Sequence, residues 1–212
     1  MPVEDPVAAA VAALGPEGPL ARSLPGYEAR SGQLQMATAV AEALSEDRIL
    51  LVEAGTGTGK TLAYLLPVLQ SGRKVVISTA TRALQEQIVD SDLPLAARAL
   101  GIDPEIAVMR GLGNCLCRRR SADFLASEEA LTPRYARGLR AVDSWLAGTA
   151  SGDVGELTEL SEDDPLLAHV TASSDTRLGP PCHHHESCFV TRMRRAAERA
   201  RVVVVNHHLF FA

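Results

Sequence analysis

The chain has 212 residues, a formal net charge of −5 at pH 7 and a hydrophobic content of 46%. This length suits one or two domains, and this composition is typical of a globular protein. No apolar run is long enough to cross a membrane, and the first five residues carry acid but no base, which argues against a secretory signal. We therefore expect a cytoplasmic protein without membrane contact, in which a local basic groove can still bind nucleic acid.

Helices are expected in the first part of the chain. An alanine-rich helix is predicted over residues 7–14, before a run of glycine and proline, and a second over residues 33–45 with Ser31 as its N-cap. Arg30 and Gln33 then lie at the entrance of the second helix, where an amide side chain can pair with an adenine edge or serve only as a solvated cap residue. Its predicted inner face consists of Leu34, Ala37, Val40, Ala41 and Leu44.

A glycine-rich stretch between a strand and a helix is the most informative part of the sequence. The apolar run over residues 49–52 predicts a buried strand, and an apolar helical pattern resumes at Thr61. Three glycines at alternate positions, followed by lysine and threonine, are typical of a phosphate-binding loop in this context. The loop consists of Ala54, Gly55, Thr56, Gly57, Thr58, Gly59, Lys60 and Thr61.

These residue types suit a nucleoside triphosphate. Glycines let phosphate oxygens approach the backbone, whose N–H groups form an anion-binding nest at the start of the following helix. Lys60 would reach the β- and γ-phosphates, and the Thr61 hydroxyl would ligate Mg²⁺. Ala54 stands where the usual pattern has its first glycine. The alternative is a glycine-rich turn without a ligand, which the intact Gly-Lys-Thr sequence disfavours.

A second strand is predicted over residues 75–79, followed by a helix over residues 81–100 that is interrupted near Pro94. Strand, helix and strand in this order predict a parallel sheet, whose ligands bind at the carboxyl ends of the strands. Hydroxyls, a guanidinium and an amide at such an end suit contacts with a nucleic-acid backbone, although capping of the helix by Thr79 or Thr81 remains an equal alternative. These polar residues are Ser78, Thr79, Thr81, Arg82 and Gln85.

An insertion interrupts the sheet pattern after a third strand. In chain order, the remaining predicted elements are a strand over 106–109, one or two helices over 134–147, an acidic loop over 155–164, a helix over 189–200 and a buried strand over 202–205. The insertion carries all four cysteines, Cys115, Cys117, Cys182 and Cys188. Because disulfides are rare in the cytoplasm, metal ligation, catalysis and core packing are the roles open to them.

The order of these motifs is that of a known family. The motifs are residues 27–36 (Tyr-Glu-x-Arg-x-x-Gln-x-x-Met), the phosphate-binding loop, residues 78–87, the cysteine-bearing insertion and residues 203–209 (Val-Val-Val-Asn-His-His-Leu). Together they resemble the N-terminal part of the DinG/XPD-type iron–sulfur DNA helicases of superfamily 2, closest to the bacterial DinG-like branch. The resemblance runs from about Gly15 to Ala212.

The resemblance implies a RecA-like P-loop α/β domain with a parallel sheet, interrupted by an α-rich iron–sulfur insertion. It implies an N-terminal extension over 1–26, the first part of a motor domain over 27–109, the insertion over 110–190 and a return to the motor domain over 191–212. It also implies ATP, Mg²⁺ and a 4Fe–4S cluster as cofactors, and single-stranded or forked DNA as the partner of a monomeric enzyme.

Residue roles follow from the same resemblance. Gln33, with Arg30, would read adenine, Lys60 and Thr61 would serve catalysis, and residues 78–87 would hold the single strand. Arginines that flank the cysteines would guide DNA, the alternative being a solvated helix face. These arginines are Arg118, Arg119, Arg192 and Arg195.

Two departures from the family pattern limit these expectations. The acidic box that binds Mg²⁺ and the second motor domain do not follow the Asn-His motif here, so we expect a fragment that binds nucleotide without turning it over. The runner-up is a non-hydrolysing nucleotide- or nucleic-acid-binding module, and a weaker rival is a P-loop kinase or transporter ATPase. The insertion and residues 78–87 argue against that rival.

The second departure concerns the cysteines. Cys117, Cys182 and Cys188 match three of the four family positions, but the fourth is Arg177. Cys115 lies two residues before Cys117 and can compensate, because side chains two apart in an extended segment lie about 7 Å apart on one side. The other readings are a mixed Cys/His site for zinc or iron that uses residues 183–185, and a chain without metal.

Overall fold

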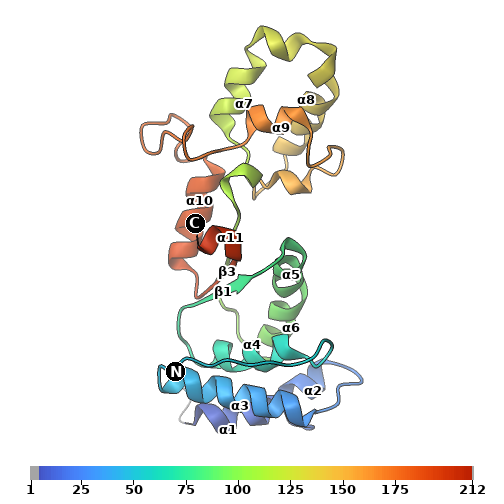
Figure 1. Cartoon of the computed structure of the whole chain (residues 1–212), viewed down its shortest axis with the longest axis vertical. Coiled ribbons are helices and arrows are strands. Elements are labelled where there is room, and N and C mark those ends of the chain that lie inside the picture. The colour runs from blue at the N-terminus through green and yellow to red at the C-terminus, as the bar shows by residue number, and fades with distance from the viewer. Residues whose placement is uncertain (1–4, 212) are drawn as a thin grey trace. The chain divides into compact units, whose positions relative to one another are not determined.

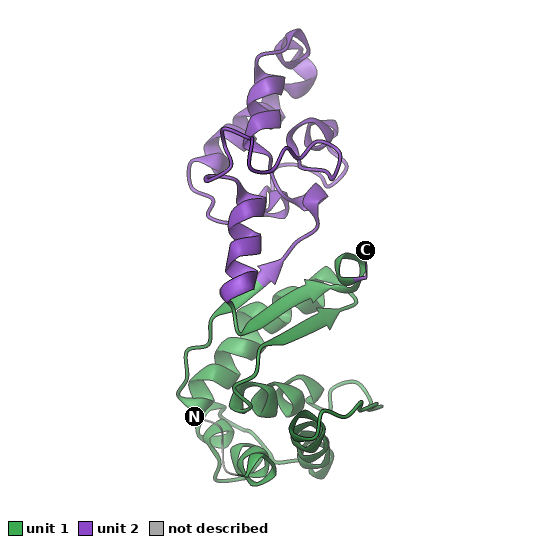
Figure 2. Ribbon diagram, turned by 90° about the vertical axis from the view of Figure 1, so that its left-hand side faces the viewer, with its two compact units in different colours: residues 1–107, 200–210 green, residues 108–199, 211–212 purple. Residues whose placement is uncertain are grey.

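The computed structural model describes residues 5–211, which form two compact units. The first unit takes in the chain up to Ala107 together with residues 200–210, and the second takes in residues 108–199 (Figure 2). Residues 1–4, on which the expectation of no secretory signal mainly rests, lie outside the described range. None of the described helices is both long and apolar enough to span a bilayer.

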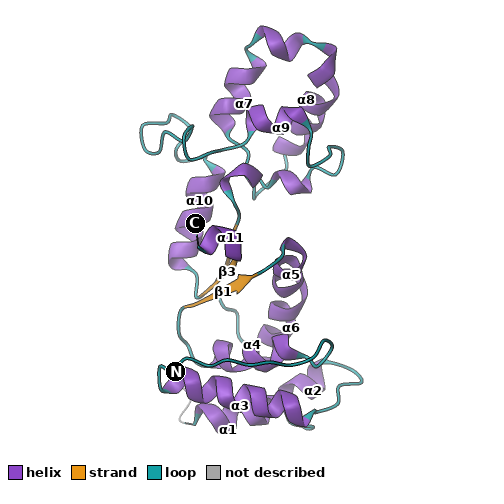
Figure 3. Cartoon of the chain, viewed as in Figure 1, coloured by secondary structure: helices purple, strands orange, loops and turns teal. Residues whose placement is uncertain are grey.

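The first unit combines helices with a three-stranded sheet of order β1-β3-β2, in which β1 and β3 run parallel (Figures 1 and 3). The predicted elements at 7–14, 33–45, 75–79, 106–109 and 202–205 are all confirmed, to within two residues at each end. In chain order the elements are α1 (Pro6–Leu14), α2 (Pro19–Ser23), α3 (Ser31–Ser45), α4 (Lys60–Gln70), β1 (Val75–Thr79), α5 (Arg82–Gln87), the π-helix η1 (Ile88–Asp92), α6 (Leu93–Leu100), β2 (Ile106–Met109), β3 (Val202–Asn206) and α11 (His207–Phe210).

The N-terminal helices belong to the core of the first unit. Leu14 and Leu20 are fully buried and pack in the same cluster as Leu65 and Leu66 of α4 and Val204 of β3. The segment that we predicted as an extension over 1–26 therefore contributes α1 and α2 to this core. Ser31 is the first residue of α3, and its predicted N-cap position is taken by Arg30.

The helix predicted over 81–100 is continuous, but one π-helical turn lies in its middle. Thr81 caps α5, since its hydroxyl accepts a hydrogen bond from the N–H of Leu84 at 3.2 Å. The π turn at Ile88–Asp92 precedes Pro94, which lacks the N–H that a regular helix would require at that position. The interruption that we predicted near Pro94 is thus a local widening of the helix.

The strand predicted over residues 49–52 is not buried. Within the described residues this run joins no strand ladder, and Ile49 and Leu51 are 96% and 92% exposed. Leu50 and Val52, on the alternate side, line a cavity of about 360 Å³ with Met36 of α3. An apolar run becomes a buried strand only where neighbouring strands flank it, and β1, β3 and β2 do not include it.

The second unit is mainly helical. Its elements are the 3₁₀-helices η2 (Leu112–Asn114), η3 (Glu128–Leu131) and η4 (Val154–Glu156), and the helices α7 (Arg118–Leu125), α8 (Pro133–Leu146), α9 (Pro165–Val170) and α10 (Phe189–Arg199). The helices predicted near 134–147 and 189–200 are confirmed as α8 and α10, whereas α7 and α9 were not predicted. The core joins Leu116, Phe124, Tyr135, Leu166 and Phe189.

Gly152 is a position in this unit where only glycine fits. Its φ is +68°, and a Cβ would lie 2.2 Å from the buried ring of Phe189. We expect Gly152→Ala to lower the free energy of unfolding by about 2–4 kcal/mol, because it combines backbone strain with overpacking. Thermal denaturation followed by circular dichroism measures this effect. Gly113→Ala, where no atom lies within 4 Å of the added Cβ, is the matched control. Equal melting temperatures for both variants would contradict the packing of Phe189.

Candidate nucleotide-binding site and nucleic-acid interface

The predicted phosphate-binding loop leads directly into α4, which begins at Lys60. Its N-cap residue Gly59 has a φ of +77°, and Gly57 has a φ of +72°, so both occupy the left-handed region that favours glycine. Gly55 has no positive φ, and the nearest atom to an added Cβ there lies 3.9 Å away. Gly57 and Gly59 are therefore the two glycines that the loop conformation itself requires.

Side-chain donors hold the carbonyl groups of the loop. The Lys60 ammonium donates to the carbonyls of Ala54 and Gly55 at 2.8 and 2.5 Å, and Arg30 Nη1 donates to Gly57 O at 2.8 Å. In a trans peptide the N–H points opposite to the carbonyl of the preceding residue. A loop whose carbonyls are fixed in this way has fixed N–H directions as well, which is what an anion-binding nest requires.

Gln33 is the buried contact between α3 and the loop. Its side chain is 93% buried, since its exposed fraction is 7%, and Nε2 donates to Gly59 O at 3.2 Å. Oε1 is buried, and within residues 5–211 it has no hydrogen-bond partner. A buried amide oxygen without a partner is costly, and an amino group supplied by a ligand would satisfy it. With this burial, Gln33 is not the solvated cap residue of the alternative reading.

A cavity of about 410 Å³ lies beside these groups. Its walls come from α3, from the extended segment before the loop and from the loop itself. Its polar lining comes from Gln33, Gln35, Glu53, Thr58 and Lys60, and Met36 and Ala39 contribute apolar surface. An apolar pocket with a few converging polar groups is the usual form of a small-molecule site.

The residues predicted to hold single-stranded DNA have unequal access. Thr79 and Gln85 are 3% and 2% exposed; Thr79 donates to Thr81 O at 3.1 Å and Gln85 to Val204 O at 3.1 Å. Gln85 thus fixes α5 onto β3. Arg82 is half-buried and pairs with Glu86 at 2.8 Å.

A contact that the sequence did not suggest lies at the carboxyl ends of β1 and β3. Ser78 Oγ lies 2.6 Å from Nδ1 of His207, a residue 129 positions away in the chain. The parallel register pairs Thr79 with Asn206, so the residue after β3 comes to lie beside Ser78. Only the pairing of the two strands brings these side chains together, and no sequence spacing could have revealed it.

The predicted DNA-guiding arginines divide into two groups. Arg118 donates to Ser187 O at 3.1 Å and Arg119 to Thr176 O at 3.0 Å, so both hold the loop that precedes α10. On α10, Arg192 and Arg199 are exposed, and Arg195 donates to Glu186 at 2.6 and 3.0 Å. Arg192, Arg195 and Arg199 follow helical spacing and lie on one face of this helix.

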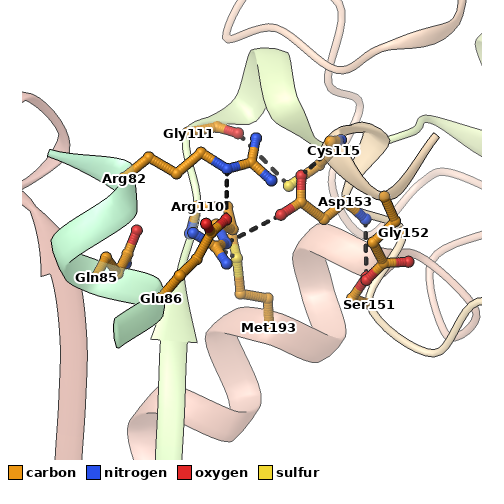
Figure 4. A network of polar contacts seen from close by, with 12 residues as sticks. Arg82, Gln85, Glu86, Arg110, Gly111, Cys115, Ser151, Gly152, Asp153 and Met193 are labelled. Atoms are coloured by element: carbon orange, nitrogen blue, oxygen red, sulfur yellow. Dashed lines mark hydrogen bonds and ion pairs between the residues drawn. The ribbon is translucent and has the colours of Figure 1, made fainter. Parts of the chain in front are cut away.

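The cysteines lie in the second unit, where Cys117 and Cys188 pack against an apolar cluster that contains Cys115. Figure 4 shows the Cys115 thiol with its partner Gly111. Burial raises the pKa of the Cys115 thiol to about 12, and the nearby Asp153 and Cys188 add to the shift. The thiol donates to Gly111 O at 3.5 Å. Among the residues that the structure describes, no three His, Cys, Asp or Glu side chains form a group that could hold a metal ion. This arrangement does not fit a cluster with four thiolate ligands.

Comparison with known proteins identifies relatives over most of the chain. A family model of DEAD/DEAH box helicases matches residues 33–111. The chain is 41% identical over 197 residues to the ATP-dependent DNA helicase YoaA of Escherichia coli (strain K12). The matched region covers 93% of this chain and 31% of that protein. It is 37% identical over 231 residues to the ATP-dependent helicase DinG of Mycobacterium tuberculosis (strain ATCC 25618 / H37Rv), covering 99% of this chain and 33% of that protein.

The same comparison includes the 3'-5' exonuclease DinG of Bacillus subtilis (strain 168), which is 33% identical over 201 residues. The chain spans about a third or less of the length of these relatives. The helicase match covers both Gln33 and the whole phosphate-binding loop, and it implies the RecA-like fold predicted from the motifs. The chain is therefore similar over most of its length to ATP-dependent helicases named DinG and YoaA, and residues 33–111 match the DEAD/DEAH box helicases.

Proposed function

We propose that this chain is the nucleotide-binding part of an ATP-dependent DNA helicase that couples ATP hydrolysis to movement along single-stranded DNA and to duplex unwinding. The observation that carries the proposal is Gln33, whose amide is buried against Gly59 with its oxygen unpartnered by the described residues, beside a cavity that Lys60 also lines. This combination supports recognition of an adenine and a triphosphate by one site.

In this function Gln33 would accept a hydrogen bond from the adenine amino group through Oε1. Lys60 would exchange its two loop carbonyls for oxygens of the β- and γ-phosphates, and Thr61, in the first turn of α4, would bind Mg²⁺. Arg30 would keep the loop in shape through Gly57 rather than touch the nucleotide. When bound, Mg²⁺ would supply charge neutralisation in the transfer step.

Single-stranded DNA would be held at the carboxyl ends of the parallel β-strands, where Thr81 and Arg82 lie. The exposed arginines of α10 would add contacts with phosphates. Thr79 and Gln85 would act indirectly, because both are buried and shape this edge. We further propose a monomeric cytoplasmic enzyme that acts on forked DNA.

DNA-stimulated ATP hydrolysis by the full-length protein tests this function. Hydrolysis that rises with added single-stranded DNA, together with strand separation on a forked substrate, is the expected result. Nucleotide and DNA binding without hydrolysis would instead support the runner-up, a non-hydrolysing binding module. Hydrolysis that DNA leaves unchanged would favour the P-loop kinase or transporter reading.

The 4Fe–4S cluster stands as a separate proposal that rests on the family resemblance. Cys115, Cys117 and Cys188 lie in and around one apolar cluster, but the four thiols would have to come closer together than they are here to bind it. If Cys115 replaces the ligand missing at Arg177, Cys115→Ser is expected to remove most of the iron and sulfide from full-length protein purified without oxygen. Chemical assay of iron, sulfide and zinc measures the result. Wild-type protein without iron would contradict the cluster, whereas unchanged iron in the variant would contradict only the role of Cys115.

A further inference from the structure

We infer that His207 is a positioning residue that orients the Ser78 hydroxyl toward a phosphate of a single-stranded nucleic acid. This inference rests on the proposed function, and it assigns to the Asn-His motif after β3 a role that the motif series did not provide. It also assigns the hydroxyl contact with the nucleic acid to Ser78 instead of Thr79. Thr79 is buried, whereas Ser78 lies on the opposite side of β1.

The position of the pair favours a ligand at this edge. Ser78 and His207 lie at the carboxyl ends of two parallel strands, β1 and β3. Ligands of open parallel sheets bind outside these ends. Ser78 is half-buried and His207 is exposed, so the pair is accessible while the strands hold it in place. The exposed cap residue Thr81 follows Ser78 on the same loop.

The hydrogen bond explains how the imidazole can act. A serine hydroxyl has one proton and two acceptor lone pairs, and it binds a phosphate by donating that proton. With Ser78 Oγ only 2.6 Å from Nδ1 of His207, the tautomer with a proton on Nδ1 donates to Oγ. The hydroxyl proton is then directed away from the ring and is ready to be donated to an anion. Binding of the phosphate selects this tautomer.

The neighbouring residues fix the histidine. Asn206 Oδ1 accepts a hydrogen bond from the N–H of His208 at 2.8 Å, which sets the first turn of α11 and thereby the direction of the His207 side chain. His208 is also exposed, but its described contact is this backbone bond, so it serves as a matched control for loss of an exposed imidazole.

Asparagine and alanine substitutions at His207 distinguish loss of the hydrogen-bond donor that orients the Ser78 hydroxyl from a general loss of protein stability. An asparagine amide places an N–H near the position of Nδ1, whereas alanine removes the donor. We expect Ser78→Ala and His207→Ala each to weaken binding of a fluorescent oligothymidine by about tenfold, the usual effect of losing one hydrogen bond to a charged group. The double variant should lose no more than either single variant, and His207→Asn should stay within about threefold of wild type.

The binding is measured by fluorescence anisotropy on full-length protein at one fixed salt concentration, with His208→Ala as the control expected to match wild type. Arg82→Ala reports separately on the proposed DNA interface. If Arg82→Ala weakens binding but Ser78→Ala does not, only the inference fails. Additive losses in the double variant, or equal losses for His207→Asn and His207→Ala, would also overturn it. If wild-type protein does not bind the oligonucleotide, the DNA-binding part of the proposed function fails together with the inference.

Discussion

Replacing Lys60 with alanine is expected to reduce DNA-stimulated ATP hydrolysis of the full-length protein by more than about 100-fold, because charge stabilisation at the transferring phosphate is lost. The Lys60 ammonium lies at the start of α4 and within reach of two loop carbonyls, so it is positioned by the loop itself. No other lysine or arginine side chain among the described residues lines the 410 Å³ cavity. Arg30, the other cation at the loop, is bonded to Gly57 O at 2.8 Å instead of lining this cavity.

The matched control for this prediction is Lys74→Ala. Lys74 is the chain's other lysine, and it lies just before β1 at an exposed position. We expect the Lys74 variant to hydrolyse ATP at close to the wild-type rate, as measured by phosphate release with saturating single-stranded DNA. Hydrolysis that survives in Lys60→Ala would refute the assignment of Lys60 and with it the proposed site.

Gly59→Ala is expected to lower nucleotide affinity more than tenfold and to lower the free energy of unfolding by about 1–3 kcal/mol. Two independent causes act at this position. The φ of +77° is strained for any residue with a Cβ, and the added carbon would lie 1.9 Å from Gln33 Nε2. The Gln33 amide would have to leave Gly59, so the change disturbs the adenine contact and the loop together.

Titration with a fluorescent ATP analogue and thermal unfolding measure the two effects. Gly32→Ala is the control, because no atom lies within 4 Å of its added Cβ and its φ is not positive. It lies in α3 one residue before Gln33, so it also tests whether any substitution near that amide disturbs the site. Wild-type affinity in Gly59→Ala would contradict the described approach of Gln33 to the loop.

Local patterns were sufficient for most of the secondary structure of the chain. Periodicity and helix-breaking residues predicted α1, α3, α8 and α10, and short apolar runs predicted β1, β2 and β3. The phosphate-binding loop could be predicted because the chemistry that it would perform depends on residues that are adjacent in the chain. The short helices α7 and α9 were missed: α7 has few apolar residues, and α9 is only six residues long, so neither shows a clear helical period.

The family resemblance, the predicted phosphate-binding loop and the order of the elements could be inferred from the sequence, because each of these is encoded in contiguous residues. The tertiary structure alone decided which polar side chains are accessible. It buried Thr79 and Gln85, joined Ser78 to His207 across 129 positions and left Ile49 and Leu51 exposed. The physical reason is that burial and side-chain pairing depend on which strands and helices become neighbours, and residues distant in the chain supply those neighbours.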